Sequence, residues 1–256
     1  MSHPLISVVI ASRNHAHLLL DTLKSIYQQR PPFEFEVILI DNGSEDHTPS
    51  MCKRFPRLKY IQCPLGNVVY NPAKARNEGV KHARGDILIC QSDDVIHALP
   101  NTIEFLTTKL NPGQFLIANC YVYDKTTGII KGAWVSVIKP KPLFFLGSLW
   151  REDYFKIGGN DEEFIFHGSE DRWFGDCLVR GAHLECVNVP IIGLHQNHPR
   201  VNYNIAPSLE LHRQKRLAAE SGAGAWIASG GPWPLFIHGK SYYDVLAERR
   251  SCPLAT

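Results

Sequence analysis

Three short segments in the first 90 residues are continuous apolar runs rich in Val and Ile, at 5–11, 36–40 and 86–90. Their apolar positions do not alternate with polar ones, which is typical of strands buried on both faces of a parallel sheet. A weaker fourth strand is predicted at 58–62. The first third of the chain is therefore expected to form a buried parallel sheet.

Helical patterns separate these strands. Apolar residues recur at helical spacing over 19–27, and two prolines at 31 and 32 end the pattern. Asn71 followed by Pro72 predicts a second helix start, a cap and then a proline, with the helix ending near residue 85. The order β-α-β-α-β-α-β indicates right-handed crossovers and a sheet with helices on both faces.

The pattern changes from about residue 115. Segments 115–123 and 129–138 predict mixed or antiparallel strands, and 208–220 and 242–249 predict helices. The chain shows no internal repeat and no low-complexity tract.

A further helix is predicted over 169–180. Ser169 is suited to cap it, Glu170 and Asp171 fill its first turn, and Gly181 follows its end. Acidic residues in a first turn complement the helix dipole, but a carboxylate there is also a candidate general base. Both interpretations stay open on the pattern alone.

Polar residues follow three predicted strands at the sheet edge where such folds bind ligands. The groups are Ala11, Ser12, Arg13 and Asn14 after the first strand, 41–46 after the second, and Ser92, Asp93 and Asp94 after the fourth. Two adjacent carboxylates in such a loop suit a hard divalent cation bound to a diphosphate, although an exposed acidic turn is the alternative. His195 and His198 have metal-ligand potential, against the alternative of surface histidines.

Asp41 and Arg76 each have both a structural and a ligand-binding interpretation. Asp41 opens an Asp-Asn-Gly-Ser turn and either caps that turn or accepts the N–H of a pyrimidine base. Arg76 is a candidate partner of the base or the phosphates, or else a surface ion-pair residue.

The composition of the chain excludes several classes of protein. The formal net charge of +2 argues against a nucleic-acid-binding footprint, and the seven cysteines lack zinc-finger spacing. Free, buried thiols in a reducing compartment are expected. The start of the chain lacks a signal-peptide pattern, and no run of about 18 apolar residues predicts a membrane span. A cytoplasmic protein is therefore expected.

A Gly- and Pro-rich stretch near the end gathers aromatic residues with prolines, namely Trp226, Pro232, Trp233, Pro234 and Phe236. These aromatic side chains suit stacking on an acceptor sugar or peripheral contact with a membrane surface. Closing the core over the sheet edge is the favoured interpretation.

Five segments in this order resemble family-2 glycosyltransferases of the GT-A fold. They are ISVVIASRN, LLLDTLKSIYQQ, EVILIDNGSEDHT, NPAKARNEGVKHARGDILICQSDDV and KIGGNDEEFIFHGSEDRWFGDCLVRGA. The resemblance covers about residues 5–195. It implies an α/β GT-A domain at 1–198, with a nucleotide-binding half at 1–98 and an acceptor-side half at 99–198. An extension over 199–256 is expected to pack on it as helices and loops.

By position, the resemblance implies roles for individual residues. The nucleoside side would comprise Ala11, Ser12, Arg13, Asp41 and Arg76. Asp93 would lie near the ribose or the cation, and Asp94, with His195, would bind Mn²⁺ or Mg²⁺. Asp171 would be the catalytic base, and Glu170 would place the acceptor.

The implied activity is inverting transfer of a sugar, of the hexosyltransferase type, from a nucleotide-sugar donor to an acceptor hydroxyl. A UDP-sugar is the preferred donor, and the acceptor is expected to be a glycan or glycolipid in polysaccharide or glycoconjugate synthesis. A cytoplasmic enzyme with peripheral membrane contact would fit this role.

Three positions depart from the family pattern. Ala-Ser-Arg-Asn replaces the usual Pro-Thr-Tyr-Asn after the first strand, Gln91 replaces the first aspartate of D-x-D, and Asn160 replaces the Phe of GGFDE. These changes keep open a degenerate domain that binds nucleotide or glycan without turnover. A sugar-nucleotide nucleotidyltransferase is a further alternative, but a glycine-rich loop is missing after the first strand. An NAD-dependent enzyme fits poorly for the same reason.

Overall fold

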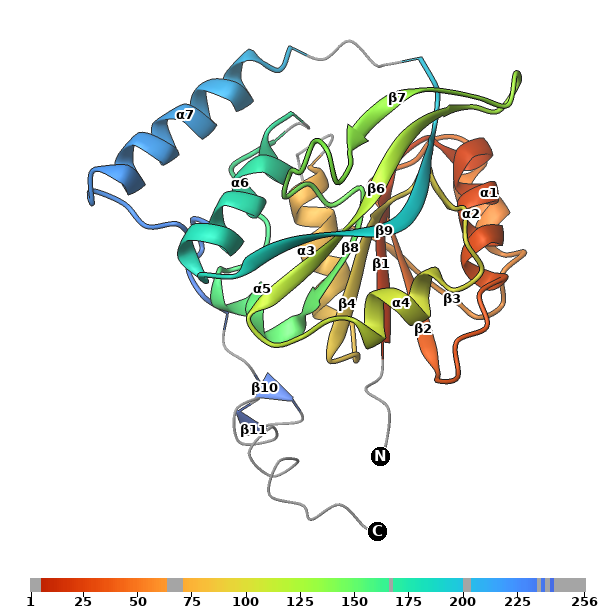
Figure 1. Cartoon of the computed structure of the whole chain (residues 1–256), viewed down its shortest axis with the longest axis horizontal. Coiled ribbons are helices and arrows are strands. Elements are labelled where there is room, and N and C mark those ends of the chain that lie inside the picture. The colour runs from red at the N-terminus through yellow and green to blue at the C-terminus, as the bar shows by residue number, and fades with distance from the viewer. Residues whose placement is uncertain are drawn as a thin grey trace.

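The predicted strand–helix alternation is present in the computed structural model (Figure 1), which describes residues 6–63, 71–165, 168–199 and 204–233 and the strand pair 236–237 and 240–241. The first half contains β1 (Ile6–Ser12), α1 (Ala16–Tyr27), β2 (Phe35–Asp41), α2 (Thr48–Cys52), β3 (Leu58–Gln62), α3 (Pro72–Lys81) and β4 (Ile87–Ser92). Strands β3, β2, β1 and β4 are adjacent in that order and parallel. The predicted parallel sheet is therefore confirmed.

The second half extends the same sheet with mixed strand directions. Its elements are β5 (Val95–His97), α4 (Thr102–Thr108), β6 (Gln114–Asp124), β7 (Ile129–Val135), β8 (Leu146–Trp150), α5 (Arg151–Lys156), α6 (Glu170–Asp176), a π-helical turn (Cys177–Gly181), β9 (Glu185–Gln196) and α7 (Ala206–Glu220). The sheet order continues from β4 through β8, β6 and β9 to β5, and β7 pairs with β6. Two short strands, β10 (Phe236–Ile237) and β11 (Lys240–Ser241), form a separate pair. The helix expected over 242–249 lies outside the described residues.

The strand directions place the end of β9 beside the end of β4. Strand β8 is antiparallel to both β4 and β6, and β6 is parallel to β9. Strand β9 therefore runs in the direction of β4, and its last residues reach the carboxyl edge of the sheet. Its pairing with β6 has an irregularity where Ala118 pairs with Val189 but Asn119 pairs with Ile192, so Pro190 and Ile191 are extra residues in β9. A proline is tolerated at such a bulge.

Helices cover both faces of the sheet, as expected (Figure 1). Alternate residues of β1 point to opposite faces. Val8 joins a core that contains Leu23 of α1 and Leu106 of α4. Val9 joins a second core that contains Ala75 of α3 and Trp173 of α6. Each core buries a large aliphatic and aromatic set, and these two layers hold the strand ends in fixed positions.

The helix predicted at 169–180 begins as expected, but its cap differs. Ser169 makes no capping bond with its side chain, and its hydroxyl instead donates to the carbonyl of Gly168. The carboxylate of Glu170 accepts the backbone N–H groups of Gly168 at 2.8 Å and Ser169 at 3.2 Å. Ser169 therefore occupies the predicted N-cap position, but its side chain does not make the expected capping bond. The α-helix also ends at Asp176, and a π-helical turn replaces its predicted last turn.

The aromatic side chains of the last described loop pack inward. Trp226 stacks on Trp173 with ring centroids 5.5 Å apart, and Trp233 packs against Tyr154 and Phe155. Core closure, the favoured interpretation, is observed for both tryptophans, and their packing does not support membrane contact through them. Pro234 and the side chain of Phe236 lie outside the described residues. Among the helices described, none has the length and apolar character needed to cross a bilayer.

The six cysteines in the described part of the chain are unpaired thiols, and all but Cys186 are buried. This arrangement agrees with the expectation of free thiols packed into the core.

Candidate functional site

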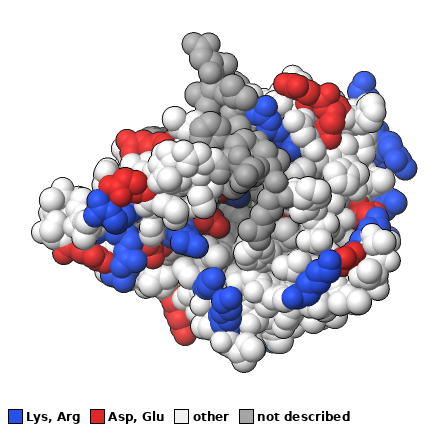
Figure 2. All heavy atoms as spheres, turned by 90° about the horizontal axis from the view of Figure 1, so that it is seen from above, with Lys and Arg blue, Asp and Glu red and all other residues white. Residues whose placement is uncertain are grey.

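The loops that follow the parallel strands meet at one edge of the sheet, the upper edge in Figure 1. In register, Ser12 lies opposite Asp41, and Ala11 lies opposite Ser92. From above, basic and acidic side chains are interspersed around this side of the molecule (Figure 2). The polar groups expected to gather at this edge do so for the first, second and fourth strands.

Asp93 connects the first and fourth strands. Its carboxylate accepts the Ser12 hydroxyl at 2.5 Å and lies 3.1 Å from Nδ1 of His15. The hydrogen bond with Asp93 raises the pKa of His15 to about 9, although burial opposes protonation. A protonated His15 therefore faces Asp93 at neutral pH. No pattern in the sequence indicates a role for His15, because it lies three residues beyond β1 and 78 positions from its partner Asp93.

Asp94 and two histidines form a compact cluster. The Nε2 atoms of His195 and His198 lie 3.2 Å and 3.1 Å from the same Asp94 oxygen. The possible ligand atoms of the three residues lie within 4.8 Å of one another. The family resemblance implies His195 as a cation ligand, and His198 is a further candidate from the sequence. The structure brings both histidines to Asp94. Strand β9 accounts for this, because His195 is opposite Val95, the residue after Asp94.

The donor set fits a divalent cation. The second oxygen of Asp94, Oδ1, is buried and has no hydrogen-bond partner among the described residues, and Nδ1 of His195 is also unpaired there. Burial opposes ionisation of Asp94, but the hydrogen bond from His198 and the nearby imidazoles outweigh it and lower its pKa. An ionised carboxylate with two imidazoles offers mixed oxygen and nitrogen ligands to a divalent cation.

The loops that follow β1 and β2 are hydrogen-bonded to each other. The side-chain oxygen of Asn14 accepts the backbone N–H of Glu45 at 2.7 Å, and the Ser44 hydroxyl accepts that of Asn14 at 3.0 Å. Asp41 accepts the backbone N–H of Ser44 at 2.7 Å and the hydroxyl of Tyr60 at 2.5 Å. The turn-capping interpretation of Asp41 is therefore observed. A carboxylate has about four acceptor positions, so its predicted contact with a base stays compatible with this geometry.

Arg76 of α3 and Glu170 of α6 form an ion pair, with Nη1 and Oε1 3.3 Å apart. Arg76 was predicted beside the nucleoside; in the structure this contact joins it to the other half of the site. Burial raises the pKa of Asp171 to about 6, and the charge of Glu170 adds to the shift. Asp171 is partly exposed at the start of α6 and is mostly ionised at neutral pH.

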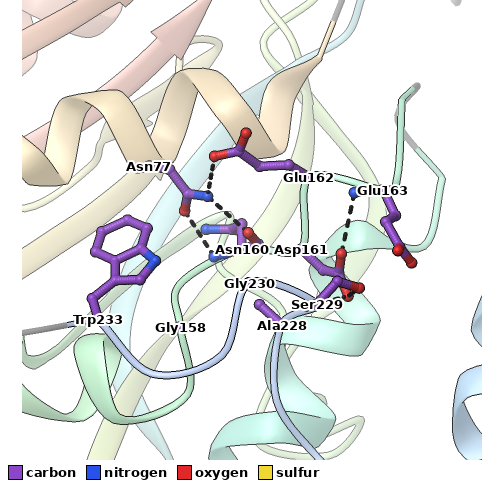
Figure 3. A pocket seen from close by; sticks show the side chains of 10 residues that line it. All are labelled: Asn77, Gly158, Asn160, Asp161, Glu162, Glu163, Ala228, Ser229, Gly230 and Trp233. Carbon is purple, nitrogen blue, oxygen red and sulfur yellow. Dashed lines mark hydrogen bonds between the residues drawn. The ribbon is translucent and has the colours of Figure 1, made fainter.

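A pocket of about 430 Å³ lies beside α3, between the loop at 158–163 and the loop at 228–233 (Figure 3). Asn160, which replaces the family's Phe, is 4% exposed and donates from its amide to the Tyr154 hydroxyl at 2.8 Å. Asn77 accepts that hydroxyl and donates to the carbonyl of Asn160, both at 2.8 Å. Asn160 is therefore part of a buried polar network with Asn77 and Tyr154.

The right-hand side of the same pocket is closed by charged groups (Figure 3). The fully buried carboxylate of Asp161 accepts from Ser229 and lies 2.9 Å from Nζ of Lys215 on α7. Lys215 also lies 2.6 Å from Glu163. Because these side chains are paired with one another, we interpret this part of the pocket as a joint that holds α7 against the loop.

Comparisons with known proteins agree with this architecture. The family model described as "Glycosyl transferase family 2" matches residues 7–166. The uncharacterized glycosyltransferase YfnE of Bacillus subtilis is 39% identical over 95 residues, which are 36% of this chain and 24% of that protein. Validoxylamine A glucosyltransferase of Streptomyces hygroscopicus subsp. jinggangensis is 34% identical over 128 residues, 47% of this chain and 30% of that protein. Less than a third of either relative is therefore matched.

Solved structures show the same fold at low identity. S. aureus TarS 1–349 in complex with UDP-GlcNAc superposes with a TM-score of 0.65 at 16% identity, covering 86% of this chain and 67% of that one. The mannosyltransferase PcManGT from Pyrobaculum calidifontis, in complex with GDP-Man and Mn²⁺, gives a TM-score of 0.58 at 18% identity, covering 87% and 65%. These likenesses confirm the GT-A fold class expected from the sequence.

Proposed function

Because this chain belongs to glycosyl transferase family 2, we propose that it transfers a sugar from a nucleoside diphosphate donor to an acceptor hydroxyl. One observation carries the proposal. The Asp94–His195–His198 cluster, suited to a divalent cation, lies at the sheet edge where the strands that carry Ser12 and Asp41 also end. A fold of this kind binds its ligands at that edge.

The donor would lie along the loops after β1 and β2. Asp41 would accept the N–H of a pyrimidine base, with Ala11, Ser12 and Arg13 around the nucleoside. Uridine is the preferred base, and the complexes of TarS with UDP-GlcNAc and of PcManGT with GDP-Man support a nucleoside diphosphate sugar of either kind. We expect Arg76 to remain with Glu170 and to contribute positive charge near the phosphates.

Asp94, His195 and His198 would hold a Mn²⁺ or Mg²⁺ ion beside the diphosphate. Such an ion, when bound, stabilises the negative charge that develops on a departing phosphate oxygen. The hydrogen bond with Asp93 raises the pKa of His15, whose ring centroid lies 5.0 Å from that of His198, so His15 would supply a second positive group beside the cluster. The chain itself thus supplies both the ligands and a fixed cation.

Asp171 would act as the general base. Its carboxylate takes the proton of the acceptor hydroxyl while that oxygen forms a bond to the anomeric carbon. The bond from that carbon to the diphosphate breaks, and the nucleoside diphosphate leaves from the opposite face, which inverts the configuration. A base with a pKa of about 6 is ionised at neutral pH yet accepts a proton readily. Glu170 would place the acceptor through its contacts with Arg76 and the Gly168 loop.

The acceptor is expected to be a glycan or glycolipid. The relatives include a glucosyltransferase named for validoxylamine A and poly-beta-1,6-N-acetyl-D-glucosamine synthase of Staphylococcus epidermidis, and these names support an acceptor of this kind.

Donor turnover tests the proposal. The full chain would be incubated with UDP-glucose, UDP-GlcNAc and GDP-mannose, with Mn²⁺ or with EDTA, and release of the nucleoside diphosphate would be measured. Release that needs Mn²⁺ and increases with acceptor sugars supports transfer. Binding of a nucleotide sugar without release, under all these conditions, would instead identify a binding module.

A further inference from the structure

Gln91 occupies the position where the family resemblance places the first aspartate of D-x-D. Its side chain is only 4% exposed, near the end of β4. The amide oxygen lies 2.8 Å from Nε2 of His97, and the amide nitrogen donates to the carbonyl of Val95 at 3.0 Å. Both ends of the side chain are therefore occupied by β5 and are not directed to a ligand.

These bonds span the turn that carries the two carboxylates. Asp93 and Asp94 connect β4 to β5, and Gln91 joins the strand before the turn to the strand after it. The other side of β5 pairs with β9, where the backbone N–H of Gln196 donates to the carbonyl of Asp94 at 2.9 Å. The distance from Asp94 to His195 therefore depends on how firmly β5 is held.

The hydrogen-bonded pair of Gln91 and His97 requires a neutral amide at position 91. Burial lowers the pKa of His97 to about 3, so its ring is neutral and its Nε2–H needs an acceptor. The carbonyl of Val95 needs a donor. A glutamine side chain offers an acceptor and a donor at the correct reach, whereas a carboxylate would place an oxygen against the Val95 carbonyl oxygen. Leaving such a buried group unpaired is costly.

His97 also links the turn to α1. Its backbone N–H donates to the hydroxyl of Ser25 at 3.0 Å, and that hydroxyl donates to the carbonyl of Thr22 at 2.8 Å. All three residues are buried. Strand β5 is thus held by a helix on one side and by the Gln91 amide across the turn.

We propose that Gln91 is a positioning residue that fixes the Asp93–Asp94 turn for cation binding and does not itself bind the cation. The inference rests on the cation site of the proposed function and explains how that site is built without the first aspartate of the family motif. Residue 91 acts on the cation through Asp94, as second-shell groups do in other metal sites.

Mn²⁺ affinity of the purified full chain, measured by calorimetry without a donor, tests this role. Gln91→Met keeps the length and removes both hydrogen bonds, and we expect a roughly 10–100-fold weaker affinity. Asn160→Leu is the matched control, because Asn160 is also 4% exposed and its amide donates to the Tyr154 hydroxyl at 2.8 Å, in the core on the other face of the sheet. This control should lose similar resistance to urea but keep its Mn²⁺ affinity.

A double-variant experiment distinguishes the hydrogen bond between Gln91 and His97 from a general effect of core packing on Mn²⁺ affinity. His97→Leu should weaken Mn²⁺ binding like Gln91→Met, and the double variant should lose little more than either single one. Gln91→Asp should also bind more weakly, since its carboxylate lacks both the reach and the donor.

Three results would overturn the inference. They are Mn²⁺ affinity of Gln91→Met within about two-fold of the unmodified chain, an equal loss in Asn160→Leu, or tighter binding in Gln91→Asp. An unmodified chain that binds no Mn²⁺ would refute it together with the cation site. Sugar transfer is a separate readout, so a chain that never turns over a donor but shows this affinity pattern would refute only the proposed function.

Discussion

Nη1 of Arg76 lies 3.3 Å from Oε1 of Glu170, and this ion pair joins the helix before β4 to the helix that carries the candidate base. The two residues are 94 positions apart. The pair therefore connects α3, in the first half of the chain, with α6, in the second half. It also sets the charge next to Asp171, because Glu170 raises the pKa of Asp171 and Arg76 lowers it.

Removing the charge of Glu170 should therefore shift the pH dependence. Asp171 must be ionised to act as a base, so activity should fall as the pH drops through its pKa of about 6. Glu170→Gln removes a contribution that raises this pKa, so the acidic limb of kcat/KM against pH should move to lower pH. A limb that stays in place, or moves to higher pH, would contradict the assignment of Asp171.

Asp171→Asn should reduce transfer by roughly 10²–10⁴-fold, because an amide cannot take the proton of the acceptor. Binding of UDP with Mn²⁺, measured by calorimetry, should change little. Asp176→Asn is the control on the same helix, since Asp176 pairs with His212 at 3.1 Å instead of facing the site. Asp171 would lose its role if its variant turned over donor at a rate close to that of the control.

A third prediction concerns the cluster of Asp94, His195 and His198. Asp94→Ala and His198→Ala should each weaken Mn²⁺-dependent UDP binding by about ten-fold or more, because each removes a ligand. His212→Ala removes a histidine that also pairs with an aspartate but lies on α7, and it should bind as the unmodified chain does. Affinities with and without EDTA would be compared. Equal affinities of all variants in Mn²⁺ would place the cation elsewhere.

Lys215 should contribute to stability and not to chemistry. Lys215→Met leaves the fully buried carboxylate of Asp161 without its cation, which costs about 3 kcal/mol in the free energy of unfolding. Arg213→Met, on the same helix, removes an exposed pair with Glu210 and should have little effect. Urea unfolding of both variants measures the difference, and equal stabilities would mean that the joint between α7 and the loop is weak.

The sequence predicted the parts of the fold that local pattern determines. Strands β1, β2 and β4 are continuous runs of Val, Ile and Leu, and α3 begins at Pro72 with the side chain of Asn71 accepting the N–H of Lys74 at 2.8 Å. Strand β9 was missed, because Asn188, Pro190 and Gly193 interrupt its apolar residues and disguise it as a loop. It belongs to the sheet because β6 and β5 pair with its two edges.

The strand pattern predicts the place of site residues only where they follow strands, whereas the roles of Glu170, Asp171 and His195 are implied by the family resemblance. Asp93 and Asp94 directly follow β4, so the fold implied their place at the edge. Their partners His15 and His198 lie 78 and 104 residues away, and no spacing in the sequence connects them. The hydrogen bond that Glu170 accepts from the backbone N–H of Gly168 was also not predictable, because it depends on the side chain turning back past the start of its own helix.

The two extra residues of β9, Pro190 and Ile191, fix which side chains of that strand reach the cation cluster. Deleting one of them would shift everything beyond by a single position and send the His195 imidazole to the other side of the sheet, away from Asp94. A one-residue insertion or deletion between the start of β9 and its histidine would therefore abolish the cluster without altering any of its members, whereas a change in the length of an exposed loop would leave it intact.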